Sequence, residues 1–246
     1  MDEALVSTIR ERYQYVLEKI TGAGTRSGRK PGSVRLVVVS KSQPLKVVQA
    51  AITAGVSILG ESYAEEAVSK ITALPETAIE WHMIGHVQSR KADLVIGHFS
   101  LLHSLDSVKL AGRLDRVCEG SHQNLPVLLE LNVGGEESKF GFPAWDESHW
   151  HELEIIVKQI IAFPRLQIRG LMTMPPFSND PEQSRPYFRK LHRLQLFFME
   201  RFPLTDWTEL SMGTSSDYIT AVEEGATYVR VGQAILGPRP VLRKND

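Results

Sequence analysis

Short apolar runs alternate with helical segments along most of the chain, and this alternation restricts the possible folds more than any other feature. The residues Leu36-Val37-Val38-Val39 form one such run, and a continuous apolar run is typical of a strand buried on both faces of a parallel sheet. Eight strand–helix units fit between residues 34 and 231, which predicts an α/β fold with a single closed (β/α)8 barrel, a TIM barrel. An open doubly wound sheet is the alternative, although it usually has fewer strands. The predicted strands are Val34–Ser40, Ser57–Leu59, Glu80–Ile84, Leu101–Ser104, Val127–Val133, Gln167–Met172, Asp206–Leu210 and Thr227–Val231.

An amphipathic helix is expected before the first strand, because Val6, Ile9, Val16 and Ile20 recur at helical spacing and share one face. A loop containing glycine and arginine, residues 21–33, is expected to end this helix. The helices predicted between the strands lie near Leu45–Ala54, Tyr63–Thr72, Ser89–Ile96, Ser107–Glu119, Trp145–Ala162, Pro181–Arg201 and Asp217–Glu224.

The length and composition of the chain fit one domain, and its charge gives no sign of a surface that binds nucleic acid or membrane. Barrels of this type occupy about 250 residues, and no linker or low-complexity block divides the chain, so one domain over residues 1–246 is expected. The formal net charge is −1 with no long basic run, so we expect binding to neither nucleic acid nor an anionic membrane.

Cys118 is the single cysteine, which fits a reducing compartment. No apolar run approaches the roughly 20 residues of a membrane span, and the N-terminus lacks the layout of a secretory signal, so a cytoplasmic protein is predicted.

Lys41 directly follows the first predicted strand, at the barrel face where such folds build their sites. Partial burial beside apolar neighbours lowers the pKa of a lysine and frees its amine to attack a carbonyl. A lysine that extends to solvent from the mouth of a strand is an equally common arrangement.

Two glycine-containing segments, residues 210–217 and 229–235, follow the seventh and eighth predicted strands. Glycine lets backbone approach a phosphate closely, and free N–H groups at a helix start bind anions. The hydroxyls of residues 211–216 add further donors, although capping of the next helix is the more common role for Ser215, Ser216 and Asp217. Arg230 offers a fork of donors, although a salt bridge at the strand end is its more common role. Barrel closure would place both segments beside Lys41, so a reactive lysine and two phosphate-type loops are stronger evidence for a site together than any one of them alone.

Ordered segments over nearly the whole chain resemble one known family, the pyridoxal phosphate homeostasis proteins, also called proline-synthase co-transcribed proteins. The fold of that family resembles the N-terminal barrel domain of alanine racemase. The matching segments are Val37-Val38-Val39-Ser40-Lys41, Gly60-Glu61-Ser62-Tyr63, Trp81-His82-Met83-Ile84-Gly85, His103-Ser104-Leu105-Asp106, Ser138-Lys139-Phe140-Gly141, Gly170-Leu171-Met172-Thr173-Met174, Ser211-Met212-Gly213 and Val229-Arg230-Val231-Gly232.

The resemblance implies that Lys41 carries pyridoxal 5′-phosphate as a Schiff base and that backbone N–H groups near Ser211, Gly213, Gly232 and Gln233 hold its phosphate. It also implies that the cation of Arg230 lies near the pyridine nitrogen, which weakens the ring as an electron sink. His82 fits a satisfied histidine at a strand end better than a metal ligand, and no metal site is predicted. The predicted cofactor-binding set is Lys41, Ser62, His82, Met174, Ser211, Gly213, Thr214, Arg230, Gly232 and Gln233.

Three residues depart from the usual family pattern. The family has Asn where this chain has Ser62 and Arg90, and Met where it has Thr214. Ser62 is therefore expected to lack a contact that an amide makes near the cofactor, whereas Thr214 adds a hydroxyl near the phosphate.

Three functions compete on these observations. The first is a non-catalytic protein that holds or delivers pyridoxal phosphate in vitamin B6 homeostasis, as a monomer with transient contacts to enzymes that use the cofactor. The second is an amino-acid racemase with weak activity; two-base racemisation needs an acid on each side of the substrate carbon, and only Lys41 is evident. Racemases of this fold also carry a second domain, for which the chain up to Asp246 leaves no room. The third is a Schiff-base aldolase, which usually carries its lysine on a later strand.

Overall fold

The computed structural model describes residues 2–74 and 78–239, and its strands form the predicted closed barrel. The sheet order is β4-β3-β2-β1-β9-β8-β7-β5, and an additional pairing of β4 with β5 closes the ring. All of these pairings are parallel. A two-residue strand, β6 (Phe142–Pro143), extends β5 at one edge. The barrel strands are β1 (Arg35–Val39), β2 (Ile58–Glu61), β3 (Glu80–Met83), β4 (Leu101–Leu105), β5 (Leu125–Asn132), β7 (Leu166–Met172), β8 (Glu209–Ser211) and β9 (Tyr228–Val231).

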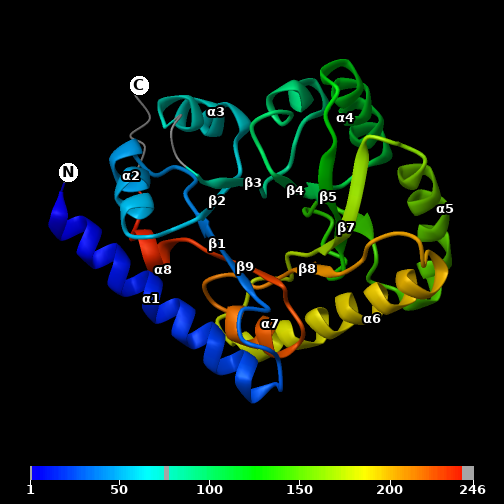
Figure 1. Cartoon of the computed structure of the whole chain (residues 1–246). Helices are drawn as coiled ribbons and strands as arrows, with labels where there is room; N and C mark the ends of the chain where they lie inside the picture. The colour runs from blue at the N-terminus through cyan, green and yellow to red at the C-terminus, as the bar shows by residue number, and fades with distance from the viewer. Residues whose placement is uncertain (1, 75–77, 240–246) are drawn as a thin grey trace.

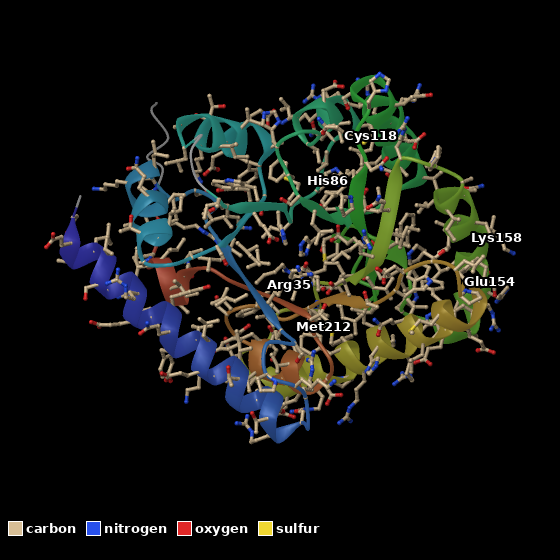
Figure 2. The ribbon with its side chains drawn as sticks, viewed as in Figure 1. Arg35, His86, Cys118, Glu154, Lys158 and Met212 are labelled. Atoms are coloured by element: carbon tan, nitrogen blue, oxygen red, sulfur yellow. The ribbon has the colours of Figure 1, made fainter. Side chains whose placement is uncertain are left out.

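Helices surround the strands as an outer ring, and the long α1 lies across the outside of α2, α7 and α8 (Figure 1). Among the described residues, no helix is long and apolar enough to cross a membrane. Cys118 is buried on the outer helix α4 (Figure 2). The helices are α1 (Glu3–Arg26), α2 (Leu45–Thr53), α3 (Ala64–Ala73), α4 (Val108–Ser121), α5 (Trp150–Ile161), α6 (Arg185–Arg201), α7 (Tyr218–Glu223) and α8 (Gln233–Leu236), with 3₁₀-helices η1 (Ser89–Leu94), η2 (Glu147–His149) and η3 (Pro181–Ser184).

The helices predicted at Trp145–Ala162 and Pro181–Arg201 begin as the 3₁₀-helices η2 and η3, and two other predicted helices differ more from the observed ones. The first helix does not end near residue 21 but continues to Arg26, because buried Ala23 and Gly24 pack toward α7; a Cβ on Gly24 would lie 4.0 Å from Val222 Cγ1. The segment predicted as a helix at Ser89–Ile96 forms only the 3₁₀-helix η1. Its N-terminus lacks a side-chain cap, and the chain turns at Gly97 with φ of +80°, so too few residues remain for a stable α-helix.

The core has two layers, one inside the barrel and one between the strands and the helices. The inner layer is a small apolar cluster whose largest member is Tyr228, and a row of buried polar side chains crosses the barrel beside it. The outer layer holds most of the large apolar side chains, which follows from strands that present one face inward and one face to the helices. The inner cluster consists of Val37, Ile58, Leu101, Leu128, Met172 and Tyr228.

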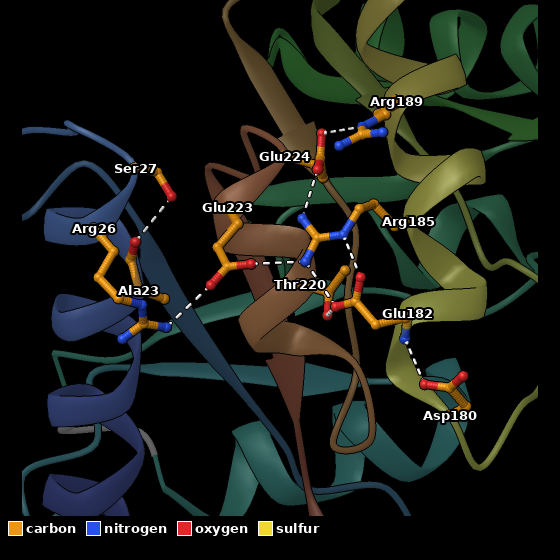
Figure 3. Close-up of polar contacts among 10 residues, drawn as sticks. All are labelled: Ala23, Arg26, Ser27, Asp180, Glu182, Arg185, Arg189, Thr220, Glu223 and Glu224. Atoms are coloured by element: carbon orange, nitrogen blue, oxygen red, sulfur yellow. Dashed lines mark hydrogen bonds and ion pairs between the residues drawn. The ribbon is translucent and has the colours of Figure 1, made fainter.

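An ion-pair network anchors α7, the helix that follows the first glycine-containing segment (Figure 3). Arg185 at the start of α6 donates hydrogen bonds to Glu182, Glu223 and Glu224. Arg26 at the end of α1 also pairs with Glu223, 3.0 Å away. Since α1 and α6 both attach to Glu223 and Glu224, the C-terminal end of this short helix is held in a fixed place.

Candidate functional site

A cavity of about 830 Å³ opens at the carboxyl ends of the strands, the face where barrels of this type build their sites. It brings together residues from distant parts of the sequence, as barrel closure predicts. Of the ten predicted site residues, those that line the cavity are Lys41, Ser62, Met174, Thr214, Arg230, Gly232 and Gln233.

Lys41 lies two residues after the end of β1 and is half-buried in the cavity wall. Burial lowers the pKa of its ammonium group, and the nearby charges of Arg239 and Arg230 lower it further, against an opposing effect of Glu61. A lysine that simply reached out to solvent would not show this desolvation. The geometry therefore favours a lysine whose amine is available as a nucleophile.

The turn that carries Lys41 is held from behind by a buried cluster of charges. Ser42 adopts φ of +58°, a left-handed conformation that is costly for a residue with a side chain. Its N–H donates to Glu66 Oε1 at 2.7 Å, and the Lys70 ammonium donates to the Ser40 carbonyl at 2.7 Å. Lys70 also pairs with Glu61 and Glu66, at 2.7 and 2.6 Å. The cluster thus fixes the backbone on both sides of the lysine.

The loop after β8 exposes backbone donors to the cavity. Asp217 Oδ1 accepts a hydrogen bond from the Thr214 N–H at 2.6 Å, so this side chain folds the loop and makes no capping hydrogen bond to α7. The backbone N–H groups of Ser215 and Ser216 have no acceptor among the described residues, and both residues line the cavity. The capping role considered for this segment is therefore wrong for Asp217, whereas the free donors fit an anion.

Gly213 shapes this loop from beneath without lining the cavity. Its φ is +89°, and a Cβ there would lie 2.4 Å from the Ala221 Cβ of α7, so no other residue fits without movement. The second loop approaches from β9: a Cβ on Gly232 would lie 3.1 Å from the Val39 carbonyl oxygen. The Ser215 hydroxyl accepts from the Gly232 N–H at 3.4 Å, so the two loops meet.

Arg230 is almost fully buried and points into the cavity from β9. It donates to Ser211 Oγ, to the Thr173 carbonyl at 2.9 Å and toward Met174 Sδ at 2.9 Å. It forms no ion pair with any described residue, so the salt bridge considered from the sequence is wrong. Burial lowers the pKa of Arg230 to about 10, which leaves it cationic at neutral pH. Ser211 lies beneath the arginine rather than in the cavity wall.

Ser211 and Gly213 lie just behind the cavity wall, whereas His82 lies away from this cavity. Its Nδ1 lies 3.0 Å from His103 Nε2, and its ring lines a smaller cavity at the opposite, amino-terminal mouth of the barrel, together with Arg35 and Glu80. Burial lowers the pKa of His82 to about 3, so the ring is neutral. Arg90, one of the departures from the family pattern, is exposed and donates to Gln88 Oε1 at 3.0 Å.

Several lining residues were missed in the sequence. Lys91 and Arg239 join Lys41 and Arg230 in the wall, so four basic side chains face one carboxylate, that of Glu65. This excess of positive charge suits an anionic ligand. A basic residue after the last strand was visible in the sequence, but nothing there showed that the chain returns to the cavity mouth.

The comparisons with known proteins agree with this geometry. A family model described as alanine racemase, N-terminal domain, matches residues 25–240. The pyridoxal phosphate homeostasis protein of Vibrio alginolyticus is 37% identical over 238 residues, 95% of this chain and 99% of that protein. The protein of the same description from Aquifex aeolicus (strain VF5) is 36% identical over 229 residues, 93% of this chain and 97% of that protein.

Solved structures give the same picture. PipY of Synechococcus elongatus PCC7942, solved with PLP bound, superposes with a TM-score of 0.78 at 32% identity and covers 93% of this chain and 100% of its own. An alanine racemase of Clostridium difficile 630 has a TM-score of 0.67 at 14% identity, over 96% of this chain and 58% of the racemase. The likeness to the racemase extends to the fold alone.

Proposed function

The chain belongs to the alanine racemase N-terminal domain family, within the group of pyridoxal phosphate homeostasis proteins, and from this membership we propose that it binds pyridoxal 5′-phosphate as a Schiff base on Lys41. We further propose that the whole chain acts as one cofactor-binding domain that holds the cofactor for vitamin B6 homeostasis in the cytoplasm. The proposal concerns the larger cavity, at the carboxyl ends of the strands.

The observation that carries the proposal is the meeting of a desolvated lysine and unpaired backbone donors in one cavity. Lys41 supplies an amine of lowered pKa, as a Schiff base requires. The N–H groups of Ser215 and Ser216, with the hydroxyls of their loop and the start of α8 at Gln233, would hold a phosphate. The basic side chains of the wall would neutralise its charge. The residues present therefore fit the group.

When bound, the cofactor would supply an aldehyde that condenses reversibly with an amine, with release of water. Lys41 would present that amine, and the positive charges of Arg239 and Arg230 favour its neutral form. Arg230 is held by Ser211 and Thr173 as a cation that cannot donate its proton to a ring nitrogen at neutral pH. A fixed cation there would suit a holding role better than carbanion chemistry.

We propose a carrier rather than an enzyme, acting as a monomer with transient contacts to enzymes that use the cofactor. The names of the relatives support this, since they describe homeostasis rather than a reaction. A weak racemase activity is the alternative, because the barrel is shared with alanine racemases.

Two assays on one preparation separate these functions. The protein is saturated with pyridoxal phosphate, freed of excess by gel filtration, and mixed with the apo form of an enzyme that needs this cofactor. We expect the enzyme to regain activity, and we expect L-alanine to stay optically pure when incubated with the loaded protein alone. Loss of all cofactor during gel filtration would overturn the binding proposal. Racemisation that disappears in Lys41→Ala would overturn the carrier proposal and favour the enzyme.

A further inference from the structure

A row of hydrogen-bonded side chains crosses the barrel interior from one mouth to the other. Arg230 on β9 donates to Ser211 Oγ on β8, and Ser211 Oγ lies 2.7 Å from His103 Nδ1 on β4. His103 Nε2 lies 3.0 Å from His82 Nδ1 on β3. His82 Nε2 lies 3.5 Å from the carboxylate of Glu80, at the amino-terminal mouth. No part of the proposed cofactor binding uses the two histidines.

The inner members of this row are shielded from solvent. Ser211 and His103 are fully buried and line neither cavity, so they cannot exchange a lost partner for water; His82 is 1% exposed and Arg230 is 4% exposed. The ring of Tyr228 stands edge-on to both imidazoles, with centroids 5.4 and 5.2 Å away. An unmade hydrogen bond in this place is therefore costly, and the row should be fully connected.

Ser211 determines which way the hydrogens of the row point, because its hydroxyl has one hydrogen to donate and its neighbour Arg230 has donors only. If Ser211 accepts from Arg230 and donates its own hydrogen to His103 Nδ1, then His103 carries its proton on Nε2 and donates to His82 Nδ1. His82 then also carries its proton on Nε2 and points it at Glu80.

The reverse direction fails at Ser211. A proton on His103 Nδ1 would make it a donor to Ser211 Oγ, which already accepts from Arg230. The hydrogen of the Ser211 hydroxyl would then have no acceptor among the described residues, because Ser211 is fully buried and its hydroxyl hydrogen-bonds only to these two groups. The hydroxyl hydrogen therefore points at His103 Nδ1, and His82, which accepts at Nδ1, carries its own proton on Nε2.

We propose that His103 and His82 are positioning residues, both neutral and protonated on Nε2, which act through Ser211 to hold the guanidinium of Arg230 in place at the cofactor cavity. The hydrogen-bond direction does not depend on the proposed function, whereas its effect on cofactor affinity rests on that function.

The direct test is the nitrogen spectrum of the histidines in the full-length, cofactor-free protein at neutral pH. Long-range ¹H–¹⁵N correlation distinguishes a protonated Nε2 from a protonated Nδ1, and the single variants His82→Gln and His103→Asn assign the two rings. We expect both rings to carry hydrogen on Nε2. A proton on Nδ1 of either ring, or a doubly protonated ring, would overturn the proposal.

Matched variants of His103 test the effect on Arg230. The amide oxygen of Asn stands close to the position of Nδ1 and can accept from Ser211, whereas Leu cannot. We expect His103→Leu to weaken pyridoxal phosphate binding about tenfold, the equivalent of one hydrogen bond, and His103→Asn to restore affinity to within about threefold of wild type. Equal affinity of both variants with wild type would contradict the role of the row. If His103→Leu does not fold, Ser211→Ala replaces it with the same expectation. If wild-type protein bound no cofactor, the proposed function would be refuted. The tautomers of the two histidines would still be tested, because that measurement uses the cofactor-free protein.

Discussion

Lys70 donates a hydrogen bond of 2.7 Å to the backbone carbonyl of Ser40, the residue before Lys41, and so ties helix α3 to the turn that presents the lysine. The same ammonium pairs with Glu61 and Glu66, and Glu66 in turn accepts from the N–H of Ser42. The position of the proposed Schiff-base lysine thus depends on charges buried behind it.

Lys70→Met should strongly destabilise the fold, because it leaves the Glu61 carboxyl group buried without its cationic partner. Breaking a buried pair by removing one member costs about 3–5 kcal/mol, and protonation of Glu61, whose pKa is already raised by burial, would bring the loss toward the lower value. Urea denaturation measures the change in the free energy of unfolding.

Lys158→Met is the matched control for that variant, since Lys158 also pairs with a glutamate four residues before it, Glu154 on α5 (Figure 2). This pair is exposed, so the control should lose less than about 1 kcal/mol. Equal losses in the two variants would show that the buried cluster behind Lys41 contributes no more to the free energy of unfolding than an exposed ion pair does.

Gly213→Ala should destabilise the protein by about 3 kcal/mol, because φ of +89° is strained for alanine and the new Cβ would lie 2.4 Å from Ala221 Cβ. Gly55→Ala is the control: Gly55 has φ of +103° with nothing within 4 Å of a new Cβ, so it loses only about 1–2 kcal/mol. Thermal and urea unfolding of both variants check this. A smaller loss for Gly213→Ala than for Gly55→Ala would mean that α7 does not pack tightly beneath the loop.

Pyridoxal, which lacks the phosphate, should bind at least about 100-fold more weakly than pyridoxal phosphate, since each hydrogen bond to a charged group contributes about 1.5–3 kcal/mol. The free N–H groups of Ser215 and Ser216 are the donors that would lose their acceptor. Equilibrium dialysis of both compounds measures the ratio. Similar affinities would place the phosphate outside this loop.

Glu130 gives a prediction for pH. Burial, with the nearby charge of Asp106, raises the pKa of this carboxyl group to about 7, from 4.5 for an exposed glutamate. Between these two values the folded state binds more protons than the unfolded state, so stability is complete below pH 4.5 and falls as pH rises toward 7. The loss approaches about 3 kcal/mol. Glu130→Gln has an amide in place of the carboxyl group, so it cannot ionise and does not show this loss of stability.

The difference in unfolding free energy between Glu130→Gln and wild type should therefore shift in favour of the variant between pH 4.5 and pH 8. Urea denaturation of both proteins across this range measures it. A difference that does not change with pH would mean that Glu130 keeps an ordinary pKa in the folded protein.

The sequence predicted the parts of the site that depend on the order of elements along the chain. Lys41 after an apolar strand and the glycine-containing loops after the last two strands required only the rule that strand ends meet at one face. The structure confirms that these residues meet in one cavity.

The sequence did not show how deep a side chain lies in the barrel. His82 faces the interior, as does Ile84 two residues later, but His82 lies one layer lower and nearer the opposite mouth. The depth of a side chain in the barrel depends on how neighbouring strands are staggered along each other. The residues of one strand alone do not determine this stagger. Lys70 was missed for a different reason. The helical spacing places it on the same face of α3 as Ala64 and Ala67, and this face is buried. Lysine side chains are seldom buried, so the sequence alone did not single Lys70 out.

The central claim is that pyridoxal phosphate forms its Schiff base on Lys41, and reductive trapping tests it most directly. Wild type, Lys41→Ala and Lys91→Ala are incubated with the cofactor, reduced with borohydride, digested and mapped by mass spectrometry; Lys91 is the control because it lines the same cavity. We predict one pyridoxyl group on Lys41 in wild type and in Lys91→Ala, and none at a stoichiometric level in Lys41→Ala. A label spread over several lysines, or one that persists in Lys41→Ala, would contradict the claim.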